Sequence, residues 1–162
     1  MMLGLSPLAS SIVICSIAAA LEGLCAGNGV ASFFASLKFP RYALPLWAWM
    51  LVGGGYYGLF GFVLYRVAPL TSPLATATYA IVLFMMLANA LSNYVIFRMR
   101  DLRLAFLIGA LAPVFDIALF GCLMNLDRKA GIALLPYLMY RAYAVWWGHA
   151  LWKLNTPRGT VR

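Results

Sequence analysis

The chain has 162 residues, of which 65% are hydrophobic and 10% are charged, and its mean hydropathy is +0.91. A soluble domain carries roughly 25% charged residues, so this composition excludes a water-soluble enzyme and predicts an integral membrane protein. The net charge of +8 comes mostly from basic residues that lie between the long apolar runs and near the C-terminal end. This distribution is typical of an orientation signal in a membrane protein rather than of a nucleic-acid partner, and it predicts membrane lipid as a partner.

Five long apolar runs follow one another, each about as long as the ~20 residues that a helix needs to cross a bilayer. They lack the alternation of polar and apolar residues that is typical of a membrane β-barrel strand. The sequence therefore predicts an all-α fold, a five-transmembrane-helix bundle that forms one domain over residues 1–162. The predicted spans are residues 6–27, 44–66, 72–97, 103–125 and 131–154.

The first predicted helix carries Glu22 near its end, and the longest connection, residues 28–43, follows it. Lys38, Pro40 and Arg41 lie in this connection. Proline has no backbone N–H and interrupts helices, so these residues predict a loop at the membrane interface.

Glycines recur along the second predicted helix at Gly54, Gly58 and Gly61. Small residues at this spacing let helix backbones approach closely in lipid. We interpret them as packing positions inside the bundle, with the seam of a homodimer as the alternative.

The basic residues are distributed unevenly between the two ends of the predicted helices. One end receives Lys38, Arg41, Arg98, Arg100, Arg103, Lys153, Arg158 and Arg162, and the other receives Arg66, Arg128 and Lys129. Cationic loops stay preferentially in the cytoplasm. We therefore predict that the N-terminus is outside and the C-terminus inside, in a bacterial inner membrane or an organellar membrane.

Ionisable residues at membrane depth are functional candidates by default. The fourth and fifth predicted helices form an antiparallel hairpin centred between Arg128 and Lys129, so Asp116 and Arg141 lie at the same depth. They are a candidate buried ion pair. Its structural role is mutual neutralisation, because an unpaired charge is costly in hydrocarbon.

His149 is the only histidine of the chain, and it is a candidate axial ligand for a haem iron or a chlorophyll magnesium. The simpler interpretation is an interfacial histidine near a helix end. Glu22 and His149 have similar predicted depths, which makes them neighbours if the first and fifth helices touch. The sequence contains no HExxH, P-loop or GxSxG motif, and we predict no further metal site, no catalytic residue and no enzymatic activity.

Several segments resemble the TspO/MBR family, the tryptophan-rich sensory proteins and the mitochondrial translocator protein (peripheral benzodiazepine receptor). The last span contains Leu134-Leu135-Pro136-Tyr137-Leu138-Met139-Tyr140, which is similar to the C-terminal signature of that family. Phe33-Phe34 with Leu37 and Pro40, and Pro45 with Trp47, resemble its first loop and second helix. The resemblance runs from about residue 30 to residue 156.

The resemblance implies a five-helix bundle with a pocket near the first loop. Members of the family bind porphyrins and other tetrapyrroles, sterols and synthetic aromatic ligands, and they often form homodimers. The ligand-binding positions that it implies here are Trp47, Gly53, Tyr57, Asn89, Tyr140 and Ala144. Gly53 and Tyr140 stand where the family has tryptophan, so the resemblance implies a cavity with one large aromatic wall removed.

The leading hypothesis is a membrane protein that binds a tetrapyrrole, such as a porphyrin, haem or a chlorophyll-type ring, or a similar small apolar aromatic ligand, for regulation, sensing or transport. The alternative is a non-catalytic accessory subunit of a larger photosynthetic or respiratory membrane complex. A third hypothesis, an enzyme that acts on a porphyrin, lacks a catalytic set of residues.

Overall fold

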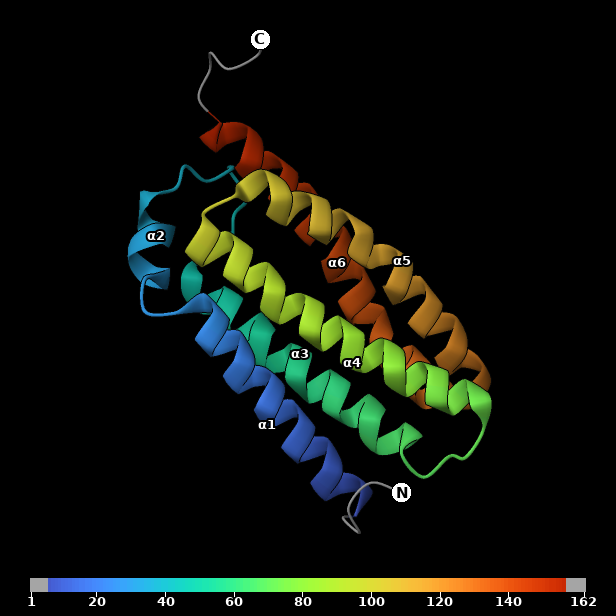
Figure 1. Cartoon of the computed structure of the whole chain (residues 1–162). Helices are drawn as coiled ribbons and strands as arrows, with labels where there is room; N and C mark the ends of the chain where they lie inside the picture. The colour runs from blue at the N-terminus through green and yellow to red at the C-terminus, as the bar shows by residue number, and fades with distance from the viewer. Residues whose placement is uncertain (1–5, 157–162) are drawn as a thin grey trace.

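The computed structural model describes residues 6–156, and every regular element within them is helical. Figure 1 shows these elements as one elongated bundle. They are α1 (Pro7–Ala26), α2 (Val30–Ser36), α3 (Leu46–Val67), α4 (Pro73–Tyr94), the π-helical turn η1 (Val95–Met99), α5 (Leu102–Leu126) and α6 (Arg128–Asn155). The all-α prediction is confirmed for this part of the chain.

Four of the helices are long and apolar enough to cross a membrane: α1, α3, α4 continued by η1, and α5. The fifth long helix, α6, has 28 residues but is not among them. It carries Arg141 and His149 in its interior and many tyrosines and tryptophans, which lower its hydropathy. The protein is an integral membrane protein, and the crossing by α6 remains a prediction.

Local sequence signals set the first residues of four helices. Ser6, Ser72, Asp101 and Asp127 each stand at an N-cap, and their side chains accept hydrogen bonds from backbone N–H groups of the first turn. Such caps satisfy donors that have no partner inside the helix. Pro7 and Pro73 follow two of these caps at the first helical position, where the missing N–H costs nothing.

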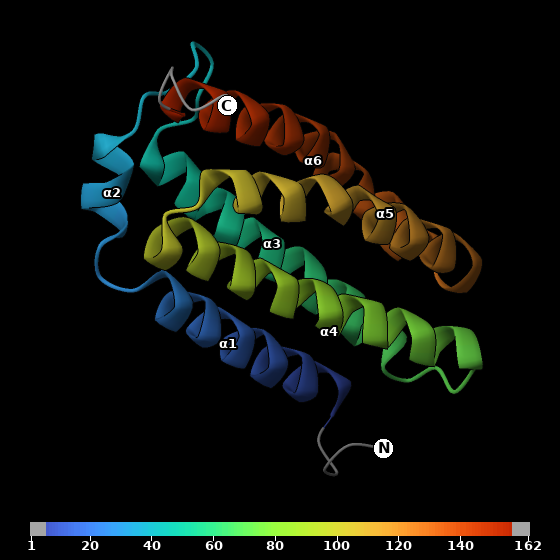
Figure 2. The ribbon, with the colours of Figure 1, turned by 45° about the horizontal axis from the view of Figure 1, so that its top comes forward.

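The five long helices run alternately up and down (Figures 1 and 2). α4 packs against α1 and α5, α3 contacts α1, α4 and α6, and α5 forms an extensive hairpin with α6. The short α2 lies beyond the end of α1 and caps one end of the bundle (Figure 2). The start of α1 and the end of α6 therefore lie at opposite ends of the molecule.

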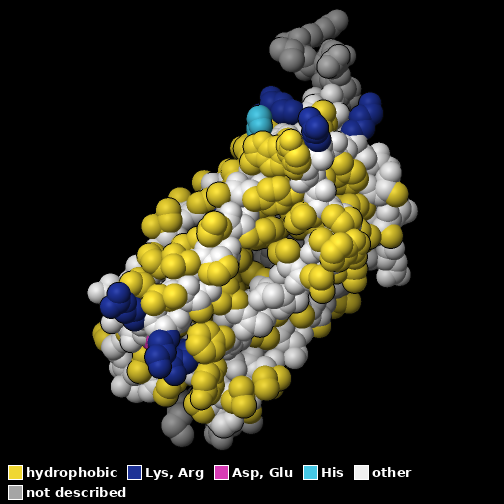
Figure 3. All heavy atoms as spheres, turned by 180° about the vertical axis from the view of Figure 1, so that it is seen from behind, with side chains coloured by type: hydrophobic (Ala, Val, Ile, Leu, Met, Phe, Trp, Pro, Cys, Tyr) yellow, Lys and Arg dark blue, Asp and Glu magenta, His cyan; other side chains and the backbone are white. Residues whose placement is uncertain are grey.

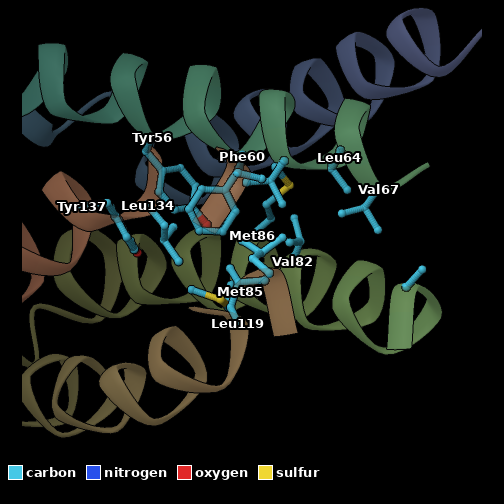
Figure 4. Packing of buried hydrophobic residues seen from close by; sticks show 14 residues of the cluster. Tyr56, Phe60, Leu64, Val67, Val82, Met85, Met86, Leu119, Leu134 and Tyr137 are labelled. Carbon is cyan, nitrogen blue, oxygen red and sulfur yellow. The ribbon is translucent and has the colours of Figure 1, made fainter. Parts of the chain in front are cut away.

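The densely packed core fills only the half of the bundle that lies away from α2. It is built from the second half of α3, the first half of α4, the end of α5 and the start of α6 (Figure 4). Phe60, Leu64, Val82, Leu119 and Leu134 are completely buried there. The described residues of the other half form no such core.

An ion pair joins the end of α3 to the turn between α5 and α6 in the packed half. The Arg66 Nε lies 2.5 Å from the Asp127 Oδ2. The Arg66 guanidinium lowers the pKa of Asp127, and the hydrogen bonds that Asp127 accepts as the cap of α6 act in the same direction. The Asp127 carboxylate is therefore ionised, both in its ion pair with Arg66 and as the N-cap of α6.

Figure 3 shows one face of the molecule, on which apolar side chains cover the length of the bundle and Lys and Arg gather towards its two ends. This is the arrangement of a protein whose middle lies in hydrocarbon and whose ends lie at the interfaces. Two of the basic residues used for the orientation prediction, Arg158 and Arg162, lie outside the described residues.

The glycine prediction for the second span is wrong in part. A Cβ built at Gly54 or Gly58 meets no atom within 4 Å, so these glycines do not pack against another described helix. Only Gly61 does so, with the Cys15 Sγ of α1 3.2 Å from a Cβ at that position. Gly54 and Gly58 leave part of the α3 surface uncovered.

Candidate ligand-binding site

A cavity of about 630 Å³ occupies the half of the bundle near α2. The end of α1, the first half of α3, the end of α4, the start of α5 and the second half of α6 form its walls. Val30 and Phe34 of α2 and Leu37 after it also line it. Ligand pockets in proteins are typically about 300–1,000 Å³, so the cavity has the size of a binding site.

One wall of the cavity is aromatic. Trp49 of α3 lies between two residues of α6, with ring centroids 4.4 Å from Trp147 and 5.9 Å from Tyr140. The Nε1 atoms of both tryptophans are buried, and neither has a hydrogen-bond partner within the described residues. A buried donor without a partner is costly, and neither N–H group is exposed to the empty cavity.

The opposite wall is polar and centres on Glu22 of α1. Its Oε2 accepts hydrogen bonds from the Tyr57 hydroxyl at 2.5 Å and the Asn89 Nδ2 at 2.8 Å. Its Oε1 accepts one from the Asn93 Nδ2 at 3.0 Å. The carboxylate thus joins α1, α3 and α4 by side-chain hydrogen bonds beside the cavity.

The structure brings the predicted Asp116–Arg141 pair together across the α5–α6 hairpin. The Arg141 Nε donates to the Asp116 Oδ2 at 2.7 Å, and its guanidinium also contacts the Tyr137 hydroxyl. Asp116 is only 1% exposed, whereas Arg141 also lines the cavity. The pair therefore neutralises two charges deep in the bundle while one face of the guanidinium remains open to a ligand.

The connection between α2 and α3 is tied to the end of α6. The Asn155 side chain accepts from the Lys38 N–H and donates to the Lys38 carbonyl, both at 2.9 Å. The Tyr143 hydroxyl accepts from the Leu44 N–H at 3.2 Å and donates to the Tyr42 carbonyl at 2.8 Å. These contacts hold the segment that follows Leu37 against the cavity end of α6.

Five of the predicted ligand-binding residues line the cavity: Gly53, Tyr57, Asn89, Tyr140 and Ala144. Trp47 does not, because it points outwards and is 65% exposed. Trp49 takes that place two positions later, since two residues correspond to about 200° around a helix. At Gly53 an added Cβ meets no atom within 4 Å, in accord with the removed aromatic wall that the resemblance implied.

His149 lies outside the cavity. It is exposed and packs against Phe106 and Trp152, with ring centroids 5.3 and 5.9 Å away. The expectation that Glu22 and His149 are neighbours is therefore wrong, because the contacts of Glu22 come from α3 and α4. The described residues that line the cavity include no histidine, so His149 is not placed to act as an axial ligand in it.

The ligand-binding residues predicted from the sequence do not include Trp49, Asn93 or Trp147, which line the cavity. For Asn93 a signal was present, because it lies four residues after Asn89 and therefore on the same face of α4. For the tryptophans, the residue pattern does not distinguish an interfacial position from a cavity-facing one, because both kinds occur at the same helix ends.

Comparison with known proteins gives one family. The family model TspO/MBR matches residues 11–153, which include all five long helices apart from a few terminal residues. No curated protein matches the chain.

Proposed function

Because the chain belongs to the TspO/MBR family, we propose that it binds a flat, apolar, aromatic ligand of the tetrapyrrole type in the cavity between its helices. Binding of a porphyrin or a similar ring serves regulation, sensing or transport, and the site holds its ligand without chemical conversion. In this proposal, residues 1–162 form a single transmembrane domain.

The observation that carries the proposal is the composition of the cavity. Trp49, Tyr140 and Trp147 form an aromatic wall, while the Asn89 side chain supplies a directional polar contact. A flat ring gains apolar burial and offset stacking against such a wall.

We further propose that all five long helices span the membrane, with the N-terminus outside and the C-terminus inside, in a bacterial inner membrane or an organellar membrane. Basic residues are more numerous at the cavity end, where Lys38, Arg41, Arg98, Arg100, Arg103 and Lys153 follow or precede the helices. The positive-inside rule then places this end in the cytoplasm or its equivalent. The ligand accordingly enters from that side.

The test is a spectral titration of the purified protein with a porphyrin that carries one neutral hydroxyl side chain. We expect a saturable shift of the main absorption band in wild-type protein and at least about tenfold weaker binding in Tyr140→Ala, because truncation removes a stacking surface worth about 1.5 kcal/mol or more. Tyr65→Ala, which alters an exposed tyrosine in the packed half, is the control and should bind normally. A shift that never saturates contradicts the proposal.

A second candidate is favoured by the uncovered glycines of α3. Gly54, Gly55 and Gly58 are exposed, and a Cβ at each meets no atom within 4 Å. A helix of another protein or a second copy of this chain can approach such a surface closely. The protein is then an accessory subunit of a larger membrane complex, and it should co-migrate with that complex in gentle detergent, whereas a ligand receptor should migrate as a monomer or homodimer.

A further inference from the structure

Glu22 differs from the other acidic residues of the chain because its charge has no basic partner within the described residues. The chain contains four acidic residues, and all of them are described. Asp116 and Asp127 form ion pairs with Arg141 and Arg66, and Asp101 caps α5 at the end of the bundle. Glu22 is also the only one of the four that lines the cavity.

The three contacts of Glu22 stabilise a carboxylate without neutralising it. The Tyr57 hydroxyl and the amides of Asn89 and Asn93 all donate to its two oxygens. The Asn93 Nδ2 also donates to the backbone carbonyl of Asn89 at 3.0 Å. This bond fixes the orientation of the Asn93 side-chain amide, with its NH₂ group towards Glu22. A carboxylate anion accepts hydrogen bonds at both oxygens in this way, and the donors are all uncharged.

The other charge in the cavity wall is already compensated. Arg141 is paired with Asp116 and contacts the Tyr137 hydroxyl. The pair contributes no net charge, so among the described side chains that line the cavity Glu22 is the charged one without an oppositely charged partner. Charges interact more strongly in these low-dielectric surroundings than in water, and a cation beside Glu22 is correspondingly favoured.

We infer that the ligand of this cavity carries a positively charged nitrogen, a protonated amine on an apolar aromatic body, and that Glu22 binds this nitrogen. The inference rests on the proposed function and narrows it. The ammonium group lies at the Glu22 wall, while the aromatic body lies against Trp49, Tyr140 and Trp147 across the cavity. Among rings of the same size, the site prefers a cationic side chain to a neutral one and a neutral one to a carboxylate.

The experiment uses three porphyrins with the same ring and one side chain each, ending in an ammonium, a hydroxyl or a carboxylate group. Binding is followed by absorption in full-length protein held in lipid nanodiscs of zwitterionic lipid, so that lipid charge does not sort the probes. In wild-type protein we expect the ammonium porphyrin to bind at least about tenfold more tightly than the hydroxyl porphyrin, since contacts to a buried charge are worth that much or more.

Glu22→Gln keeps the size of the side chain and removes its charge, and it should bring the affinities for the ammonium and hydroxyl porphyrins within about twofold of each other. Asp101→Asn is the matched control, because it removes one negative charge outside the cavity and leaves a good helix cap. It should retain the wild-type preference.

Equal binding of the ammonium and hydroxyl porphyrins to wild-type protein, or an unchanged preference in Glu22→Gln, overturns the inference while the proposed function stands. Tightest binding of the carboxylate porphyrin also overturns it and assigns the recognition to Arg141. If none of the three porphyrins binds saturably, the proposed function itself has failed. Even if Glu22→Gln does not fold, the order of the wild-type affinities for the three porphyrins can still overturn the inference.

Discussion

Asp116 and Arg141 illustrate how a buried charge is made tolerable at membrane depth. The Asp116 Oδ2 accepts a hydrogen bond from the Arg141 Nε, whereas the Asp116 Oδ1 is buried without a hydrogen-bond partner in the described residues. The carboxylate therefore depends on one basic side chain. Removal of either member leaves the other uncompensated in an apolar environment, where no water can replace the lost contact.

This dependence gives a prediction for the ion pair. Asp116→Leu and Arg141→Met should each destabilise the protein by about 3 kcal/mol, while the double variant Asp116→Leu/Arg141→Met should recover most of that loss, because it leaves no buried charge. Thermal unfolding of the four proteins in one detergent measures the coupling. Simple additivity of the two single effects would contradict a direct role for the pair.

Glu22 has no basic partner in the described residues, in contrast to Asp116. Its oxygens are occupied by three uncharged donors from α3 and α4, so hydrogen bonding is satisfied and charge compensation is not. The two acidic residues thus have different consequences for a ligand. Asp116 stabilises the bundle, and Glu22 gives the cavity its electrostatic preference.

At the scale of elements, the segment between α2 and α3 is held by side chains of α6 rather than by its own secondary structure. Asn155 makes two hydrogen bonds with the backbone of Lys38, and Tyr143 contacts the backbone on either side of Ala43. The segment follows Leu37, a cavity-lining residue. Its attachment therefore holds this segment beside the cavity end of α6.

Loss of this attachment should be measurable by proteolysis. Asn155→Ala removes two hydrogen bonds that together contribute roughly 1–2 kcal/mol, so we expect trypsin to cleave after Lys38 or Arg41 about tenfold faster. Asn125→Ala is a suitable control, because Asn125 bonds only to the Gly121 carbonyl of its own helix. Equal cleavage rates in both variants would show that the segment is held by other contacts.

α6 is the element whose membrane character depends most on its neighbours. Arg141 and Tyr137 face Asp116, and Tyr140 and Trp147 face Trp49. The polar atoms of these residues are directed into the bundle, where they are paired or border the cavity, whereas His149 of the same helix is exposed. The proposed crossing by α6 therefore requires that the other helices cover its polar side.

For the whole molecule, the main feature is the division of the bundle into a dense half and a hollow half. Completely buried residues such as Phe60, Leu64 and Leu123 fill the end near the α3–α4 and α5–α6 connections. The cavity occupies the end near α2. Close packing is therefore confined to one half of the bundle, and the other half is left open to a ligand.

The proposed orientation of the whole molecule is open to direct measurement. In a variant without Cys15, Cys25 and Cys122, single cysteines replace Lys38 or Lys129, which are exposed at opposite ends of the bundle. In right-side-out membrane vesicles, a membrane-impermeant maleimide should label Lys129→Cys and should reach Lys38→Cys only after the vesicles are opened. The reverse labelling pattern would invert the topology, and labelling of both in closed vesicles would exclude five spans.

Hydropathy along the sequence was sufficient to predict that this protein lies in a membrane and how long its helices are. A bilayer accepts only long apolar segments with internal backbone hydrogen bonds, so hydropathy alone located five helices close to their observed bounds. The Asp116–Arg141 contact also followed from counting residues, because two arms of one hairpin have equal depth at equal distance from its turn.

Which face of each helix borders the cavity depends on how the helices pack, and it could not be predicted from the residue pattern. In lipid, the outside of a helix is as apolar as its inside, so the residue pattern does not distinguish Trp47 from Trp49. The partners of Glu22 are separated from it by 35, 67 and 71 positions in the chain. Such long-range hydrogen bonds depend on how the helices rotate and pack against each other, and no local spacing encodes that rotation.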